Sequence, residues 1–205
     1  MKTINITRKN QLTTTSWSGG TTTQLAIWPE GSSYADRNFT WRVSTAWVDA
    51  DTSEFTRLPG ISRKLMVLDG TLLLRHEGHH EVKLEPFGRD SFMGDWHTVS
   101  HGRATDFNLM TTCGEGTLEA LHCAPGESVT PDASRACPDQ NLISEVFYPL
   151  SDGIAVAVPG EETFSLEKGD VLTIVRSLET PDHGLRITNN SGNDVCVIRA
   201  VIRHR

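Results

Sequence analysis

Three segments of this chain alternate apolar and polar residues over the length of a β-strand, and they constrain the fold more than any other feature. They are FTWRVSTAWV at 39–48, PGISRKLMVLDG at 59–70 and DFNLM at 106–110. Successive side chains of a strand point to opposite faces, so each segment has one apolar face and one face with charged or amide groups. In the first segment, Trp41 and Trp47 lie on the apolar face, and we expect both in the core.

The polar faces of these segments carry five groups that could converge. Alternation places Arg42 with Ser44 and Asp106 with Asn108, and it points Arg63 inward from the middle segment. Buried polar groups must pair with one another or meet a ligand. We therefore predict a pocket for a small carboxylate-bearing molecule, in which Asp106 pairs with an arginine and Asn108 stays available to the ligand. The alternative is a solvated sheet face on which arginine and aspartate pair with each other.

Length and charge narrow the function classes. The chain has 205 residues, a formal net charge of -7 and a pI of about 5.6. Its length allows one large all-β domain or two small fused ones. Nucleic-acid binding is disfavoured because a basic stripe is lacking. The longest apolar runs are strand-length and the N-terminal MKTINITRKN has no apolar signal region, so we predict a cytoplasmic protein without membrane contact.

The cysteines and the common catalytic motifs give no reaction. The four cysteines are Cys113, Cys123, Cys137 and Cys196, and none forms a CxxC pair. Zinc-knuckle and thioredoxin-type chemistry are therefore not indicated, and without a secretion signal disulfides are not expected. The sequence also lacks a P-loop, a dinucleotide-binding fingerprint, a nucleophile elbow and an HExxH motif.

Short apolar runs between Gly-rich turns indicate a sandwich or barrel rather than helices. Residues 71–84 read as a hairpin, and the polar, Pro- and Ser-rich segment 125–140 reads as a linker or long loop. The sequences on either side of it share one order of features: Asp-Gly, strand, turn, strand, Leu-Glu, Gly, Asp, strand. This weak repeat predicts two barrel-like halves, 1–124 and 141–205, packed as one unit.

The segment WSGGTT at 17–22 offers a second set of candidate ligand contacts. The backbone N–H groups and hydroxyl of Gly19, Gly20 and Thr21 could cradle an anion, or they could simply form a tight polar turn. Trp17 could close one end of a pocket or lie in the core.

Taken together, these pieces resemble a known family. The matching segments are WSGGTT at 17–22, FTWRVSTA at 39–46, EFTRLPGISRKLMVLDG at 54–70 and DFNLM at 106–110. In this order and spacing they resemble the HutD/Ves family. In the second half, LEKGD at 166–170 looks like the Gly-Asp turn that precedes a cupin strand. The resemblance implies an all-β, cupin-type double β-barrel (a bicupin) with jelly-roll halves. One departure is Ser18, where the family often has an Asn-containing run before the glycines.

The resemblance also implies a function. HutD proteins are associated with histidine utilisation genes and are thought to restrain that pathway. Its intermediates, such as urocanate and formyl- or formimino-glutamate, are carboxylates, in agreement with the two-arginine pocket. The expectation is a small-molecule-binding regulator or buffer without a cofactor. A cupin-fold enzyme of isomerase or dioxygenase type is the alternative, and a homodimer is one option for its assembly.

Metal binding is not expected. Many cupins place a metal-ligating Glu seven residues before the Gly of the following turn, and here Arg63 stands seven residues before Gly70. A guanidinium cannot ligate a metal but suits a carboxylate. The chain also has a histidine-rich stretch with His76, His79 and His80, which is expected on a solvated hairpin tip.

Overall fold

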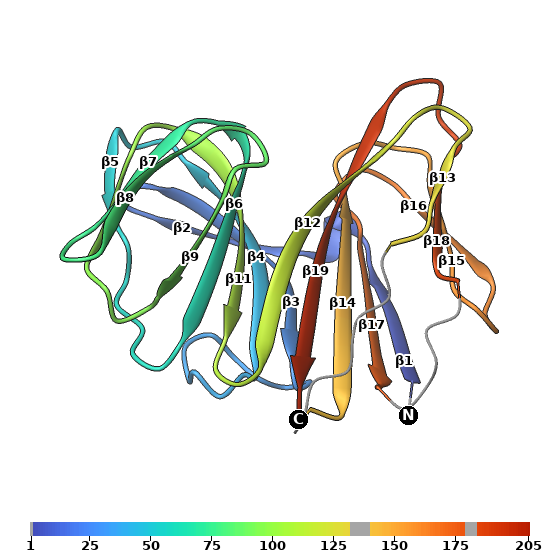
Figure 1. The fold of residues 1–205 in the computed structure, drawn as a ribbon, viewed down its shortest axis with the longest axis horizontal. Helices are drawn as coiled ribbons and strands as arrows, with labels where there is room; N and C mark the ends of the chain where they lie inside the picture. Colours follow the sequence, from blue (N-terminus) through green and yellow to red (C-terminus); the bar gives the residue numbers. More distant parts are fainter. Residues whose placement is uncertain (1, 132–139, 179–183) are drawn as a thin grey trace. The chain divides into compact units, whose positions relative to one another are not determined.

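The computed structural model describes residues 2–131, 140–178 and 184–205, which form β-strands and turns almost throughout (Figure 1). The single helical element in these ranges is a short 3-10 turn, η1 (Lys9–Gln11). The described residues contain no helix that is long and apolar enough to cross a membrane. The chain divides into two compact units. We call them the N-terminal unit, Leu12–Leu118, and the C-terminal unit, Glu119–Arg205 together with Met1–Gln11.

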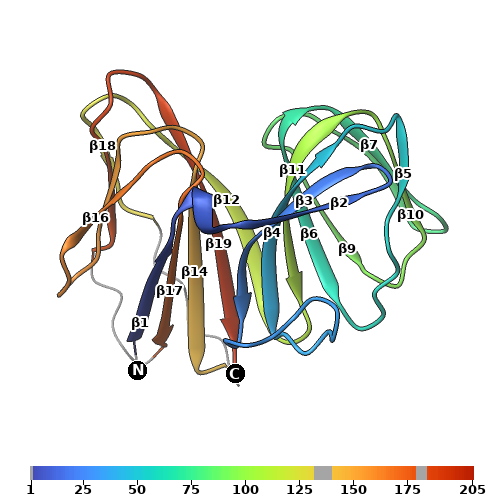
Figure 2. The same cartoon turned by 180° about the vertical axis from the view of Figure 1, so that it is seen from behind.

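The N-terminal unit has two antiparallel sheets whose inner faces share a core. The six-stranded sheet has the order β2 (Thr13–Trp17), β3 (Gly20–Trp28), β4 (Trp41–Val48), β11 (Ala104–Thr111), β6 (Ser62–Gly70), β9 (Arg89–Met93). The four-stranded sheet has the order β5 (Thr52–Glu54), β10 (Thr98–His101), β7 (Leu72–His76), β8 (His80–Leu84). Leu65 and Phe92 from the larger sheet pack with Leu72 and Leu74 from the smaller one, so apolar burial holds the sheets together. Figure 2 shows β3, β4, β11 and β6 side by side.

The C-terminal unit has the same design. Its five-stranded sheet has the order β1 (Lys2–Thr7), β17 (Val171–Ser177), β14 (Leu142–Pro149), β19 (Val195–His204), β12 (Glu115–Cys123). Its four-stranded sheet has the order β13 (Ser128–Val129), β18 (Arg186–Asn189), β15 (Ile154–Ala157), β16 (Thr163–Leu166). Phe147, Leu172, Ile187 and Val197 are among the buried residues of its core.

The predicted internal repeat is present as a repeat of strand order. In the larger sheets, β9-β6-β11-β4 of the N-terminal unit corresponds to β17-β14-β19-β12 of the C-terminal unit. In the smaller sheets, β5-β10-β7-β8 corresponds to β13-β18-β15-β16. Spacing of turns and strands therefore revealed a repeat that residue identity does not show.

The boundaries of the halves differ from the prediction. Residues 1–11 were expected in the first half, but β1 pairs with β17 from Lys2↔Arg176 onward and belongs to the C-terminal unit, as do residues 119–124. Pairing between segments so far apart in the chain has no local sequence signal. Within the predicted linker 125–140, Ser128–Val129 forms β13, while residues 132–139 lie outside the described residues.

The tryptophans of β4 behave differently from each other. Trp41 is fully buried, as expected, but Trp47 is 52% exposed, so its assignment to the core was wrong. Its cross-strand neighbours are Thr21 on β3 and Thr105 on β11, whose short side chains cannot cover an indole.

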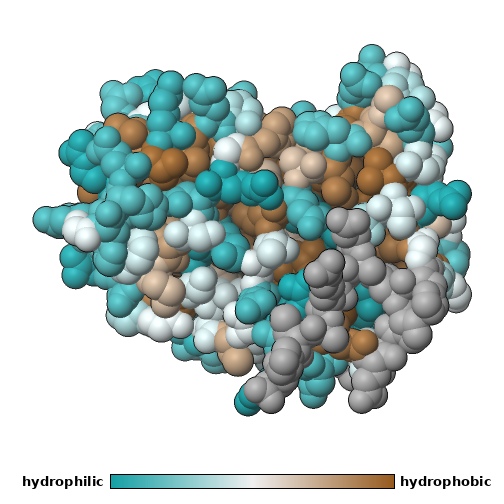
Figure 3. All heavy atoms as spheres, viewed as in Figure 1, coloured by the Kyte–Doolittle hydropathy of each residue, from teal (hydrophilic) through white to brown (hydrophobic). Residues whose placement is uncertain are grey.

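On the face that Figure 3 shows, hydrophilic residues predominate and apolar ones occupy smaller areas between them.

Candidate functional site

A cavity of about 260 Å³ in the N-terminal unit is lined by most of the residues that strand alternation predicted. The predicted residues that line the cavity are Trp17, Arg42, Ser44, Arg63, Asp106 and Asn108. Residues that sequence reasoning did not propose include Tyr34, Phe55 and Met110. The polar faces of β4, β6 and β11 therefore do converge.

Strand register sets the spacing of the two arginines. Met110 on β11 pairs with Arg42 on one side and with Arg63 on the other. The two arginines thus stand at the same level of the sheet, with one strand between them. Two strand spacings separate their Cα atoms by roughly 10 Å. Their long side chains can both reach one small anion, or they can hold the two ends of a dicarboxylate.

Arg42 is held by polar and aromatic contacts but not by a charge. Its Nε donates to Oε1 of Gln24 at 2.9 Å, and its Nη1 donates to Oγ of Ser44 at 3.1 Å. Its guanidinium carbon lies 4.6 Å from the ring centroid of Tyr34. Burial lowers the pKa of Arg42, although Tyr34 opposes this shift. The guanidinium is therefore oriented without being neutralised.

Arg63 is the more isolated of the two. Its guanidinium carbon lies 4.6 Å and 5.1 Å from the ring centroids of Phe55 and Phe92, and Nη2 donates to Oδ1 of Asn108 at 3.1 Å. The Nε atom is buried and has no hydrogen-bond partner. Burial is the main cause that lowers the pKa of Arg63 to about 10. Within the described residues, neither cavity arginine forms an ion pair.

The expected direct pairing of Asp106 with an arginine was wrong. The side chain of Asn108 lies between them: its amide nitrogen donates to Oδ1 of Asp106, and its carbonyl oxygen accepts from Arg63. Asn108 was expected to stay free for a ligand. Instead, both ends of its amide already form a hydrogen bond within the protein. Burial raises the pKa of Asp106 to about 7, and the positive charge of Arg63 only partly opposes this.

The glycine loop does not contribute to the cavity. Gly19, Gly20 and Thr21 are absent from its lining, whereas Trp17 borders it. A Cβ on Gly19 would come within 2.1 Å of the Trp17 ring, and one on Gly20 would lie 1.9 Å from the carbonyl oxygen of Trp47. These glycines permit close packing at the β2–β3 turn, which accounts for them without an anion.

The histidine-rich stretch matches the expected solvated tip at His79 and His80, which are exposed, but not at His76. His76 is 2% exposed, and its ring nitrogens lie 2.8 Å from Thr98 Oγ1 and 2.8 Å from Asp90 Oδ2. His79 stacks on Trp96 with ring centroids 3.6 Å apart. The hairpin was predicted correctly, but the contacts that bury His76 come from β9 and β10, which local sequence does not reveal.

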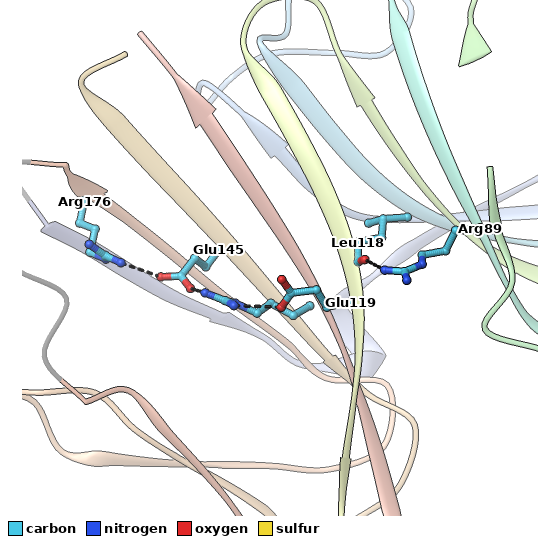
Figure 4. A network of polar contacts seen from close by, with 6 residues as sticks. Arg89, Leu118, Glu119, Glu145 and Arg176 are labelled. Atoms are coloured by element: carbon cyan, nitrogen blue, oxygen red, sulfur yellow. Dashed lines mark hydrogen bonds and ion pairs between the residues drawn. The ribbon is translucent and has the colours of Figure 1, made fainter. Parts of the chain in front are cut away.

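The C-terminal unit has charged groups of its own on the corresponding strands (Figure 4). Glu145 on β14 accepts from Arg176 on β17 at 3.2 Å and from Nε of Arg199 on β19 at 3.1 Å. Nη1 of Arg199 donates to Glu119 at 2.9 Å. Burial alone would lower the pKa of Arg199, but Glu145 and Glu119 raise it above its ordinary value. In this unit, the buried cations have internal carboxylate partners.

Comparison with known families identifies the chain. The model of the HutD family matches residues 9–191. The chain belongs to the HutD family. A solved HutD structure from Pseudomonas fluorescens SBW25 has 17% identity, a TM-score of 0.67 and coverage of 99% of this chain and 100% of that one. A conserved protein of unknown function from Pseudomonas aeruginosa PAO1 has 22% identity, a TM-score of 0.77 and coverage of 99% and 100%.

More distant structures confirm the fold class. Oxalate decarboxylase from Bacillus subtilis has 7% identity and a TM-score of 0.67, covering 95% of this chain and 76% of that one. At this identity the likeness shows the fold alone, which is the predicted all-β, cupin-type bicupin with jelly-roll halves. No curated protein sequence matches the chain.

The cavity of this HutD protein does not fit the metal centre found in many cupins. Asp106 and Glu54 are the only carboxylates among the described residues that line it, and the lining contains no histidine or cysteine. Two guanidinium groups also face it, and these repel a cation. A metal at this position is therefore incompatible with the residues present, and we assign no chemistry to one.

Proposed function

We propose that the cavity of the N-terminal unit binds a small carboxylate metabolite, of the urocanate or formyl- or formimino-glutamate type. In this proposal the protein is a cytoplasmic regulator or buffer of histidine utilisation, in keeping with its family name. Binding, rather than catalysis, is its main activity.

The observation that carries the proposal is the state of Arg63. A buried donor without a partner costs about 1–3 kcal/mol, and more when it is charged. The Nε of Arg63 is such a donor, on a cation that forms no ion pair among the described residues. A carboxylate would accept from two nitrogens of a guanidinium at once and restore the missing interactions. The paired arginines of the C-terminal unit, which have Glu145, need no such ligand.

The remaining lining restricts the ligand further. The volume of about 260 Å³ lies just below the range of roughly 300–1,000 Å³ for drug-sized ligands, so it suits a small metabolite. Phe55 and Tyr34 offer apolar ring surface beside the guanidinium groups. Asp106 can donate a hydrogen bond when protonated, or accept one from a ligand N–H when ionised. Small carboxylates that also carry an N–H group therefore match the cavity best.

Isothermal titration calorimetry with urocanate and with N-formylglutamate tests the proposal. Arg63→Met keeps the volume and removes the charge-assisted hydrogen bonds, so we expect a loss of about 1.5–3 kcal/mol, or roughly 10- to 150-fold in Kd. Arg103→Met is the control, because Arg103 pairs with Asp51 in an exposed position of the same unit. Unchanged binding of both compounds by Arg63→Met, or no binding of either by the wild type, would rule out this assignment.

A second candidate function rests on Asp106. A buried carboxyl group with a pKa of about 7 beside a cation is typical of a general acid or base. This favours a metal-free cupin enzyme of isomerase type as the alternative. Proton NMR of the bound compound in D2O would detect exchange or conversion, and Asp106→Asn should abolish it. Absence of both in the wild type would leave binding as the function.

A further inference from the structure

A second cluster of chemically active side chains lies outside the carboxylate cavity. His76 ends β7 and His80 begins β8, and the two residues are register partners across the hairpin. Partners of this kind carry their side chains on the same face, and the two imidazole centroids are 4.5 Å apart. Asp90 on β9 faces both rings.

The ligand atoms of the three side chains lie close together. Asp90 Oδ2 lies 2.8 Å from His76 Nε2, and both oxygens of Asp90 lie 3.1 Å from His80 Nε2. All three ligand atoms fall within 4.8 Å of one another. Two ligands on one Zn²⁺ ion, each bound at about 2.0–2.1 Å in tetrahedral geometry, are roughly 3.3 Å apart. The two nitrogen–oxygen distances, 2.8 Å and 3.1 Å, are within about half an ångström of that spacing.

The surroundings of the cluster fix the ring that matters most. Thr98, fully buried, contacts Nδ1 of His76 at 2.8 Å. A partner on one ring nitrogen orients the imidazole and leaves the other nitrogen for a metal, as in the outer shells of known metal sites. The rings of Phe92 and Trp96 lie 4.6 Å and 5.6 Å from that of His76 and hold it from its sides.

The cluster is also accessible. The side chain of His76 is fully buried, that of Asp90 is 12% exposed and that of His80 is 39% exposed. An ion could therefore enter past His80 and keep a water molecule on its open side. Two imidazole nitrogens that approach one carboxylate this closely need a positive centre between each nitrogen and oxygen: either a proton on nitrogen or a metal ion.

We propose that His76, His80 and Asp90 form a binding site for a divalent transition metal ion. Two histidines and one carboxylate with an open position are a recurrent ligand set for such ions. The site does not depend on the carboxylate proposal, since none of its ligands lines that cavity. Phe92 lies against both sites: it contacts His76, and its ring lies 5.1 Å from the Arg63 guanidinium.

Zn²⁺ is the probe for the test. Full-length protein is treated with a chelator and then titrated with Zn²⁺ in competition with a chromophoric chelator. We expect one equivalent to bind and the melting temperature to rise. His80→Ala and Asp90→Asn each remove a ligand and should weaken Zn²⁺ binding at least about 10-fold, and Thr98→Val about 10- to 100-fold. His101→Ala is the control, because His101 lies on β10 and contacts Thr52 instead.

Two binding results would overturn the proposal. One is a wild type without saturable Zn²⁺ binding, which would leave the cluster as a hydrogen-bonded network with protons on nitrogen. The other is that the His80→Ala variant binds Zn²⁺ as tightly as the His101→Ala variant does. A readout on the wild type guards against variants that fail to fold: the ¹⁵N shifts of His76 and His80 Nε2 must change on addition of one equivalent of Zn²⁺, and unchanged shifts refute the site.

Discussion

Replacing Asp106 by Asn should remove a specific pH dependence from the stability of this protein. Asp106 is 1% exposed, and burial raises its pKa from 3.8 to about 7 in the folded state. Because the folded pKa is raised, the folded state holds a proton that the unfolded state has lost between about pH 4 and pH 7. Its contribution to stability is therefore complete below pH 4 and is lost as the pH rises through 7.

The magnitude follows from the shift. About three pKa units at about 1.36 kcal/mol each give roughly 4 kcal/mol over the full range. Between pH 5 and pH 8, the part accessible to measurement is about 2.5 kcal/mol. Asn108 donates to one oxygen of Asp106, and an Asn at 106 can still accept this bond through its carbonyl oxygen. The neutral variant should thus match the wild type only below about pH 4. It should be more stable by about 1.7 kcal/mol near pH 5 and by roughly 4 kcal/mol near pH 8.

Urea unfolding of wild type and Asp106→Asn at several values between pH 5 and pH 8 measures this difference. Subtraction cancels the other titrating groups, and Asp69→Asn, at the exposed end of β6, is the control. A difference in unfolding free energy that stays constant from pH 5 to pH 8 would show that Asp106 ionises normally. The reasoning about the cavity would then fail, because it requires a carboxyl group removed from water.

Two further predictions concern stability. Glu145→Gln should destabilise the protein by about 3–5 kcal/mol in urea unfolding, since it removes the carboxylate that the buried guanidinium groups of Arg176 and Arg199 share; a loss below about 1 kcal/mol would show that the network in Figure 4 is dispensable. Gly20→Ala should cost more than about 1 kcal/mol, because its Cβ would meet the carbonyl oxygen of Trp47, whereas Gly192→Ala meets nothing within 4 Å and should be neutral. Equal melting temperatures for the two glycine variants would contradict this.

Period-two alternation was enough to predict which polar residues share the cavity. It works for Arg42, Ser44, Asp106 and Asn108 because β4 and β11 pair without interruption over these residues. Applied to β6, the same alternation places Asp69 on the inward face with Arg63, and there it fails, because Asp69 is exposed. The pairing of β11 with β6 skips Leu68, and this bulge turns Asp69 outward.

The rest of the site depends on contacts that local pattern does not encode. Tyr34 lies in the irregular segment between β3 and β4, and Phe55 follows β5, so neither has a strand period to read. The buried position of His76 depends on Asp90 and Thr98 from other strands. The hydrogen bonds of Asn108 are a similar case, because alternation gives the face of a side chain but not its partner.

The two units differ in how their buried arginines are paired. In the C-terminal unit a carboxylate, Glu145, lies between two arginines on neighbouring strands and neutralises them. In the N-terminal unit the residue between Arg42 and Arg63 in the register is Met110, which has no charge. No carboxylate of the described residues forms an ion pair with Arg42 or Arg63, and in the proposed function a ligand carboxylate takes that role.

Met110→Glu should therefore close the site. Glutamate has nearly the length of methionine, and its carboxylate would lie between Arg42 and Arg63, where it would compete with the ligand carboxylate at a high effective concentration. We expect at least a 10-fold loss of urocanate or N-formylglutamate affinity relative to Met110→Gln, which is polar and of the same length but uncharged. Met110 is 5% exposed, so both variants lose apolar packing with Phe39, and only the charge separates them. Equal affinities of the Glu and Gln variants, measured by calorimetry with both proteins folded, would show that the two arginines do not bind the carboxylate.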